Sequence, residues 1–153
     1  MGGEALRVDI ERYGEEFHRH VELAFERAEL AYNPPPDVVP NSRAALRLTE
    51  LARAQGTHAL THDRLMRAYW EEALDIGDPE VIARCAVEAG LDATDVDEVL
   101  AGDAYRDRVL ASTAQAQSIG ITGIPAYLLD QRLLVLGAQP REVFERAYAD
   151  LSG

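Results

Sequence analysis

The pattern of apolar residues changes at Gly120, and this change limits the possible folds more than any other feature of the sequence. Before Gly120, apolar residues recur three and four positions apart, which is the spacing of amphipathic helices. Residues 121–125 cannot be helical, because Pro125 lacks a backbone N–H and disfavours a helical conformation in the residue before it. Two short apolar runs follow, Ala126–Leu129 and Leu133–Leu136, and they predict a β-hairpin before a last helical pattern.

Prolines, glycines and capping residues divide the first part of the chain into separate helices. The three prolines at 34–36 end one helical pattern, and Gly56 and Gly90 end two others. Asp78 followed by Pro79 is typical of a helix start, and Thr94 begins a capping-box pattern. The expected helices are a short one with Leu6, Val8 and Ile10, then Phe17 to Ala28, Ala45 to Ala52, Leu65 to Leu74, Val81 to Ala89, the residues after Thr94, 103–120, and Val143 to Leu151.

The sequence therefore predicts a mostly α chain with a C-terminal β-hairpin and helix. We expect a helical region at 1–120 and a β-β-α region at 121–153. Both strands of the hairpin are continuously apolar, which predicts that both are largely buried.

Composition excludes several classes of function. The chain has 153 residues, a formal net charge of -12 and one cysteine, so it cannot form an internal disulfide, a Cys-x-x-Cys pair or a four-cysteine metal site. It has no lysine, which excludes Schiff-base chemistry. The negative charge disfavours nucleic acid and anionic membranes as partners. No apolar run is long enough to span a membrane and no secretory signal pattern is present, so we expect a cytoplasmic protein.

The remaining reactive side chains favour structural roles. Cys85 lies on a helical face with Val81 and Ile82, where a free cysteine is usually a buried apolar residue, although an exposed thiol of lowered pKa would be reactive. His58 and His62 could share a helix face, but they lack the metalloprotease pattern, and we predict no metal site and no cofactor. His18 and His20 face apart on a helix, and the pair Tyr69 and Trp70 is more typical of a core than of a ligand groove.

The segment Gly120-Ile-Thr-Gly-Ile-Pro-Ala-Tyr127 and the later Gly137-Ala-Gln-Pro140 resemble the C-terminal half of a DsbA-family thioredoxin-like protein. The similarity is to the FrnE-type oxidoreductases in particular and covers roughly residues 14–151. The upstream stretches that agree with this family are 32–35, 40–45, 68–70, 75–81 and 89–92.

The resemblance implies an incomplete thioredoxin-like (DsbA) fold with a helical insertion domain. Members of the family begin with a β-α-β unit that carries Cys-x-x-Cys, whereas this sequence starts at the insertion, so no catalytic residue carries over. What carries over is the substrate-binding segment Thr122, Gly123, Ile124 and Pro125. In the family this proline is cis, and the residue before it pairs its backbone with an extended substrate peptide.

The resemblance also bears on the hairpin turn and on function. Gln131 stands where the family tends to have glycine, so we expect a looser turn that includes Arg132.

The expected function is that of a thiol-disulfide oxidoreductase or isomerase homologue, truncated and redox-inactive by itself, with a peptide or protein thiol as substrate. The alternative is a non-enzymatic peptide-binding or assembly module that uses the cis-proline groove.

Without the β-α-β unit, the hairpin has an open hydrogen-bonding edge and an apolar face, for which Tyr127, Leu129, Leu133 and Val135 are candidates. Exposed edges favour pairing with another chain, so we expect a homo-oligomer, most simply a dimer, through this edge. Two alternatives remain, namely a separate chain that supplies the β-α-β half and a native protein that is longer than this sequence.

Overall fold

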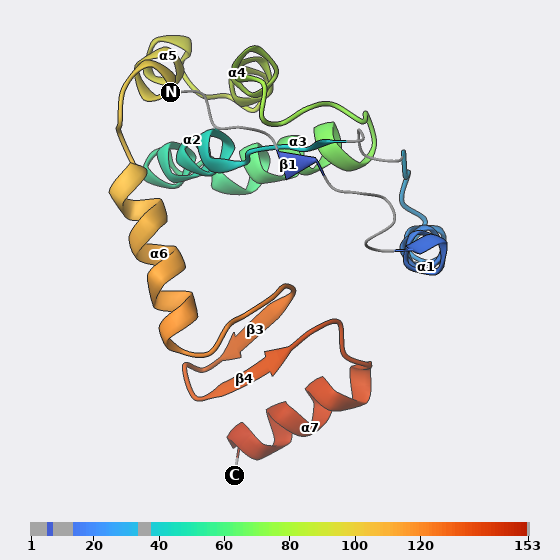
Figure 1. Cartoon of the computed structure of the whole chain (residues 1–153). Helices are drawn as coiled ribbons and strands as arrows, with labels where there is room; N and C mark the ends of the chain where they lie inside the picture. The colour runs from blue at the N-terminus through green and yellow to red at the C-terminus, as the bar shows by residue number, and fades with distance from the viewer. Residues whose placement is uncertain (1–5, 8–13, 34–37, 153) are drawn as a thin grey trace. The chain divides into compact units, whose positions relative to one another are not determined.

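The computed structural model describes residues 6–7, 14–33 and 38–152, with side chains from Arg19 onward except at 34–38. Within these ranges the chain forms helices and four short strands, and it divides into two compact units, Met1–Val109 and Leu110–Gly153 (Figure 1). The prediction of a mostly helical chain with a C-terminal hairpin and helix is confirmed. In chain order the elements are β1 (Leu6–Arg7), α1 (Gly14–Arg27), β2 (Val38–Val39), α2 (Arg43–Gln55), α3 (His58–Trp70), α4 (Pro79–Glu88), α5 (Ala93–Ala101), α6 (Arg106–Ser118), β3 (Ala126–Leu129), β4 (Leu133–Leu136) and α7 (Arg141–Ser152).

The core of the N-terminal unit lies between α2, α3, α4 and α5, which pack on one another. Each of these helices contributes a large side chain that is almost completely buried. Burial of such an aliphatic side chain stabilises the fold by about 1.5–3 kcal/mol, so this cluster holds the four helices together. The four side chains are Leu48, Leu65, Ile82 and Val96.

The start of the chain differs from the sequence prediction. Leu6 and Arg7 form β1, which pairs in an antiparallel manner with Val38 and Val39 of β2. The prediction of a short helix here is therefore wrong at Leu6, because pairing with a segment about thirty residues away decides its conformation. Val8 and Ile10 lie outside the described residues.

The first turns of α4 and α5 show which residue caps each helix. The Asp78 side chain accepts a hydrogen bond from the Glu80 N–H at 2.8 Å, and Pro79 occupies the first turn of α4, which confirms the predicted start. At α5 the capping residue is Asp92, whose carboxylate accepts from the N–H of Thr94 at 2.8 Å. Thr94 is thus inside the helix and does not cap it, which corrects the capping-box prediction. An aspartate at the N-cap also interacts favourably with the helix dipole.

The C-terminal unit contains the predicted hairpin, and α7 packs on β4. Tyr127 of β3 meets Phe144 of α7 edge to face, with ring centroids 5.0 Å apart, so α7 packs against the face of the hairpin that carries Tyr127 and Val135; Val135 is buried there, whereas Tyr127 remains 43% exposed. On the opposite face Leu128 and Leu136 are exposed. The prediction that both strands are largely buried is wrong, since Val135 is the one buried residue in the two strands. The face expected to lack cover is the one that α7 covers.

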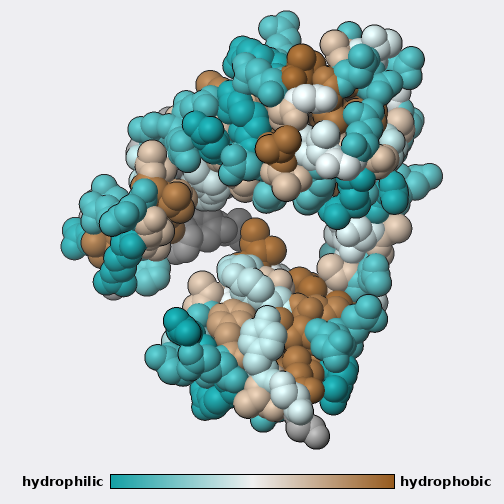
Figure 2. All heavy atoms as spheres, turned by 180° about the vertical axis from the view of Figure 1, so that it is seen from behind, coloured by the Kyte–Doolittle hydropathy of each residue, from teal (hydrophilic) through white to brown (hydrophobic). Residues whose placement is uncertain are grey.

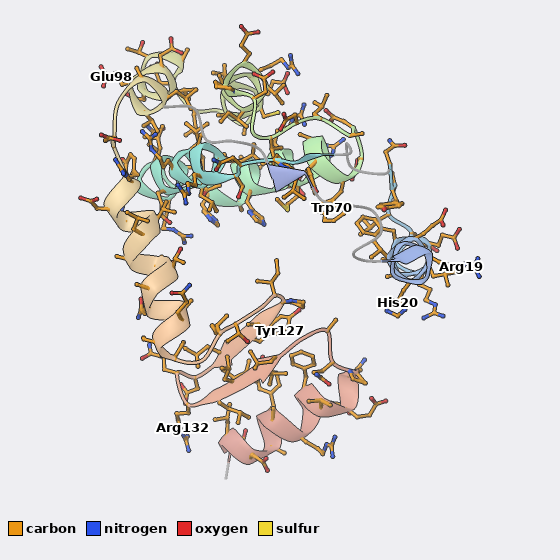
Figure 3. All side chains as sticks on the ribbon, in the orientation of Figure 1. Arg19, His20, Trp70, Glu98, Tyr127 and Arg132 are labelled. Carbon is orange, nitrogen blue, oxygen red and sulfur yellow. The ribbon has the colours of Figure 1, made fainter. Side chains whose placement is uncertain are left out.

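The hairpin turn includes Arg132 as expected, but it is built on the primed type I′ turn that Gln131 was expected to disfavour. Leu129 pairs with Leu133, so three residues, 130–132, form the loop, and the N–H of Arg132 donates to the Leu129 carbonyl at 3.0 Å. Asp130 and Gln131 both have positive φ, at 48° and 54°, a region that glycine adopts more readily than glutamine. Arg132 extends from this turn into solvent (Figure 3).

Two buried threonines differ in whether the hydroxyl group is hydrogen-bonded, so they permit a matched test of what each hydroxyl contributes to stability. The Thr61 hydroxyl in α3 is completely buried and has no hydrogen-bond partner among the described residues, whereas the Thr49 hydroxyl in α2 donates to the Leu46 carbonyl at 2.7 Å. We expect Thr61→Val to raise the free energy of unfolding by about 1 kcal/mol, because valine has the same shape without an unpaired hydroxyl. Thr49→Val should lower it by about 1 kcal/mol, because it removes a formed hydrogen bond.

Urea denaturation of both variants beside the parent chain measures the two changes. Both substitutions exchange one β-branched residue for another, so helix propensity is nearly constant. A loss of stability in Thr61→Val that equals the loss in Thr49→Val would contradict this assignment of the two hydroxyls.

Candidate functional site

The loop between α6 and β3 begins with a helix stop that the local sequence encodes. Gly120 has a φ of 86°, the left-handed conformation that ends many helices. Its N–H donates to the Gln117 carbonyl at 3.0 Å, and the N–H of Ile121 donates to the Ala116 carbonyl at 3.0 Å. This pair of bonds is the Schellman motif, and it turns the chain out of α6 and into residues 122–125.

The predicted substrate-binding residues form one continuous exposed segment. Thr122, Gly123, Ile124 and Pro125 are all exposed, and the Ile124 side chain is 94% exposed, the largest value among the exposed large apolar residues described. The Ile124–Pro125 peptide bond is cis. The Pro125 carbonyl accepts a hydrogen bond from the N–H of Gly137 at 2.8 Å, which joins the segment to the end of β4.

This anchor at Gly137 was not anticipated from the sequence, because a bond between two backbone groups leaves no side-chain signal. Gly123, by contrast, has open space where a side chain would begin and no positive φ, so the fold does not require glycine there. The segment holds one hydroxyl, that of Thr122, and no charged side chain. The backbone groups of Thr122, Gly123 and Ile124 have no hydrogen-bond partner among the described residues and lie beside an exposed apolar side chain, an arrangement suited to binding a peptide.

Cys85, the single thiol, lies in the other compact unit. It is on α4, its side chain is completely buried, and it belongs to the helical core with Ile82 and Ala86. Desolvation raises the pKa of the Cys85 thiol above its usual value, and the nearby guanidinium of Arg64 opposes this only in part. Since the thiolate is the reactive form, burial and a raised pKa both lower its reactivity.

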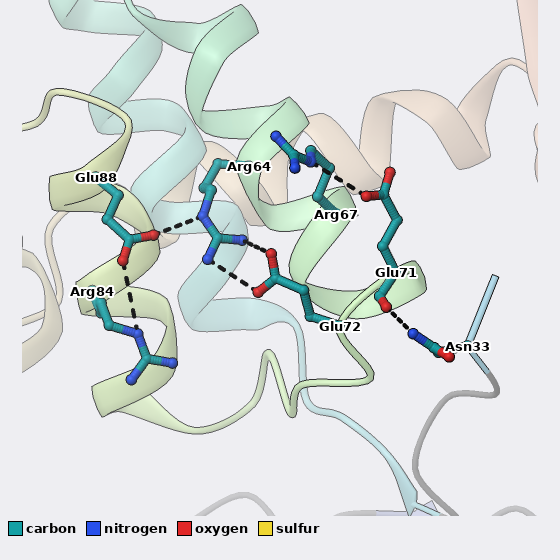
Figure 4. Close-up of polar contacts among 7 residues, drawn as sticks. All are labelled: Asn33, Arg64, Arg67, Glu71, Glu72, Arg84 and Glu88. Atoms are coloured by element: carbon teal, nitrogen blue, oxygen red, sulfur yellow. Dashed lines mark hydrogen bonds and ion pairs between the residues drawn. The ribbon is translucent and has the colours of Figure 1, made fainter. Parts of the chain in front are cut away.

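The charged groups that affect the pKa of Cys85 form ion pairs with one another (Figure 4). Arg64 donates to Glu88 at 2.7 Å and approaches Glu72 at 3.1 Å, and Arg84 lies 4.0 Å from Glu88. The two guanidinium groups lower the pKa of the Cys85 thiol and the two carboxylates raise it, while desolvation is the largest cause of the upward shift. Cys85 is therefore a structural residue of the core.

The family described as "DSBA-like thioredoxin domain" matches residues 3–149, nearly the whole chain. The chain belongs to the DSBA-like thioredoxin domain family.

This DSBA-like chain is similar to two known proteins. It resembles the crystal structure of a probable DsbA oxidoreductase from Streptomyces coelicolor, with a TM-score of 0.82 and 30% sequence identity, over 95% of this chain and 69% of that chain. It is also 28% identical over 88 residues to the uncharacterized protein YwbO of Bacillus subtilis (strain 168). That match covers 57% of this chain and less than half, 44%, of the length of YwbO.

The other candidate side chains that the structure describes do not come together in one site. The rings of His58 and His62 stack 5.9 Å apart, and Nε2 of His58 lies 3.0 Å from a guanidinium nitrogen of Arg53, so that lone pair is already engaged. Among the side chains that the structure describes, no three histidine, cysteine or carboxylate groups are placed to share a metal ion. His20 is exposed, and the His18 side chain lies outside the described residues.

The aromatic pair of α3 has a packing role. Trp70 lies at the end of α3 (Figure 3) and contacts Tyr69, Phe25 and Tyr32 at centroid distances of 4.7, 5.5 and 6.3 Å respectively. This cluster attaches α1 and the residues after it to α3, as does the bond from the Asn33 N–H to the Trp70 carbonyl at 2.8 Å.

None of the helices in the described ranges combines the length and the apolar composition that crossing a bilayer requires.

Proposed function

We propose that this chain, a relative of thiol-disulfide oxidoreductases, catalyses no thiol-disulfide exchange by itself. Exchange begins when an accessible thiolate attacks a disulfide sulfur, and release of the product requires a second thiol. The chain has one thiol, Cys85, which is completely buried and has a raised pKa. Burial of this single thiol is the observation that carries the proposal.

We further propose that the segment from Thr122 to Pro125 holds extended peptides, so that the chain acts as a non-enzymatic binding module. The 94% exposure of Ile124 supports this role, because an apolar side chain so exposed next to unpaired backbone groups is suited to contact an unfolded peptide. The resemblance to the DsbA family supports it as well, since the residue at this position pairs with substrate there.

An insulin assay separates catalysis from binding in one measurement. Insulin reduced by dithiothreitol precipitates, and an oxidoreductase shortens the delay before turbidity appears. We expect the chain not to shorten this delay, because Cys85 cannot reach the insulin disulfides. If the segment holds peptides, the chain should instead lengthen the delay by binding the released insulin chains.

Two variants serve as controls in the same assay. Ile124→Asp should abolish the lengthened delay, because a charge replaces the exposed apolar contact, whereas Cys85→Ala should behave as the parent chain. If the parent chain shortens the delay and the Cys85→Ala variant does not, Cys85 is catalytic. That result would overturn the first proposal. A delay that is the same with and without the chain would overturn the binding role.

A further inference from the structure

The two outer edges of the hairpin differ in what they offer to another strand. Pro125 and Gly137 are a hydrogen-bonded pair, and in an antiparallel ladder such pairs alternate with non-bonded ones. The next bonded pairs are therefore Tyr127 with Val135 and Leu129 with Leu133. It follows that the backbone N–H and C=O groups of the intervening residues point away from the hairpin, those of Ala126 and Leu128 at β3, and those of Leu134 and Leu136 at β4.

The edge of β4 is partly closed, whereas the edge of β3 is open. The Gln139 side chain donates to the outward carbonyl of Leu136 at 2.8 Å, so a strand added at β4 would have to displace it. The outward groups of Ala126 and Leu128 have no hydrogen-bond partner within the described part of the chain. Proteins usually block such an edge with a charge or another covering element, and β3 carries no charged side chain.

The surroundings of β3 are also free of charge. The chain has a net charge of -12, yet no charged residue occurs from Val109 to Leu129. On the face away from α7, Leu128 is 45% exposed and Leu136 is 43% exposed, and apolar surface of the C-terminal unit is visible in Figure 2. A second copy would meet electrostatic repulsion over most of this acidic protein, but not along β3.

We propose that β3 pairs in an antiparallel manner with β3 of a second copy, around a two-fold axis at Tyr127. In this register Ala126 lies opposite Leu128 of the partner subunit, and the reciprocal pair follows from the symmetry. The outward groups of both pairs then form hydrogen bonds, and the two Tyr127 side chains lie opposite each other at a non-bonded position. Asp130 lies opposite Ile124 of the partner subunit, so no like charges face each other.

Pairing extends the hairpin that α7 already supports. The dimer contains a four-stranded antiparallel sheet with both α7 helices on one face. This surface is independent of the proposed lack of redox activity, but it continues into Ile124, so a second copy and an extended peptide compete for this part of the edge. A monomer would overturn the interface alone, and reduction of insulin would overturn the redox proposal alone.

Light scattering coupled to size exclusion tests the interface with two matched variants. Leu128 and Leu134 are cross-strand neighbours on the same face, but their backbones belong to opposite edges. We expect the full chain at about 50 μM to have twice its monomer mass of 16.8 kDa, Leu128→Glu to be a monomer, and Leu134→Glu to remain a dimer. A monomeric parent chain overturns the proposal, and so does dissociation of both variants to the same degree, because it would indicate pairing through the face.

Disulfide cross-linking tests the register. In a Cys85→Ala background, Tyr127→Cys should give a covalent dimer with an added oxidant such as diamide, which takes up the two electrons and two protons that the thiols lose. The reason is that non-bonded antiparallel partners have Cα atoms about 4.5 Å apart, within the range for a disulfide. Leu129→Cys should stay monomeric on denaturing gels, because its symmetry mate lies several residues away. Equal cross-linking of the two variants would overturn the register.

Discussion

Cys85 is expected to react with the thiol reagent DTNB at least about a thousandfold more slowly in the folded chain than in the chain unfolded by guanidinium chloride. The side chain is completely buried in the helical core, so the reagent reaches it only when the N-terminal unit opens. Opening free energies in core regions approach the stability of the fold, about 5–15 kcal/mol, and each 1.4 kcal/mol lowers the open population tenfold. The absorbance of the released thionitrobenzoate measures both rates.

The pH dependence of the same reaction adds a second comparison. Desolvation raises the pKa of the Cys85 thiol, so a reaction through the folded state would increase with pH only above the range in which an ordinary thiol titrates. A reaction through opening should instead follow the titration of an unfolded thiol. Complete labelling within seconds at pH 7.5, in the absence of denaturant, would show that the thiol is accessible and would contradict the structural role given to Cys85.

Leu48→Ala is expected to lower the free energy of unfolding of the N-terminal unit by about 3 kcal/mol. Leu48 has no exposed surface and lies in the same core cluster as Leu65 and Ile82. Its replacement by alanine loses the transfer free energy of the buried methyl groups and leaves a cavity that rigid helices cannot fill. Urea denaturation followed by far-UV circular dichroism measures the loss.

Leu46→Ala is the matched control, because Leu46 lies two residues away in α2 and is 44% exposed. Its loss should stay within about 0.5 kcal/mol. The two variants also connect stability with thiol access: if Cys85 reacts through opening of the unit, Leu48→Ala should accelerate its labelling about a hundredfold and Leu46→Ala by less than about threefold. Equal effects of the two variants would mean that the described core is not the one that protects Cys85.

Features that depend on neighbours in the chain could be predicted from the sequence. Asp78 and Pro79 start α4 through a bond between residues two positions apart, and Gly120 ends α6 through bonds that span a single turn. The hairpin followed from its apolar runs and the residues between them. The boundary expected between residues 120 and 121 falls at the end of α6, whereas the compact units divide near its start, at Val109.

Features that depend on pairing between distant segments of the chain could not be predicted from the sequence. Leu6 is apolar in a helix-like pattern, but pairing with Val39 makes it part of a strand. The carboxylate of Asp92 and the hydroxyl of Thr94 could both cap α5, and only the backbone conformation of Asp92 decided between them. For the hairpin, apolar strands indicated burial without indicating which element would supply it, and α7 covers one face while the other remains exposed.

The sequence by itself determined that this chain has one thiol and a mostly helical body, because composition and local backbone preferences depend only on each residue and its near neighbours in the chain. The segment 122–125 was recognised only through its resemblance to the cis-proline segment of the DsbA family. The tertiary structure decided that Cys85 is buried in the helical core, that Ile124 is exposed, and that the edge of β3 is open while Gln139 partly closes the edge of β4. Burial and edge pairing depend on which surfaces meet after folding, and a single sequence does not specify that.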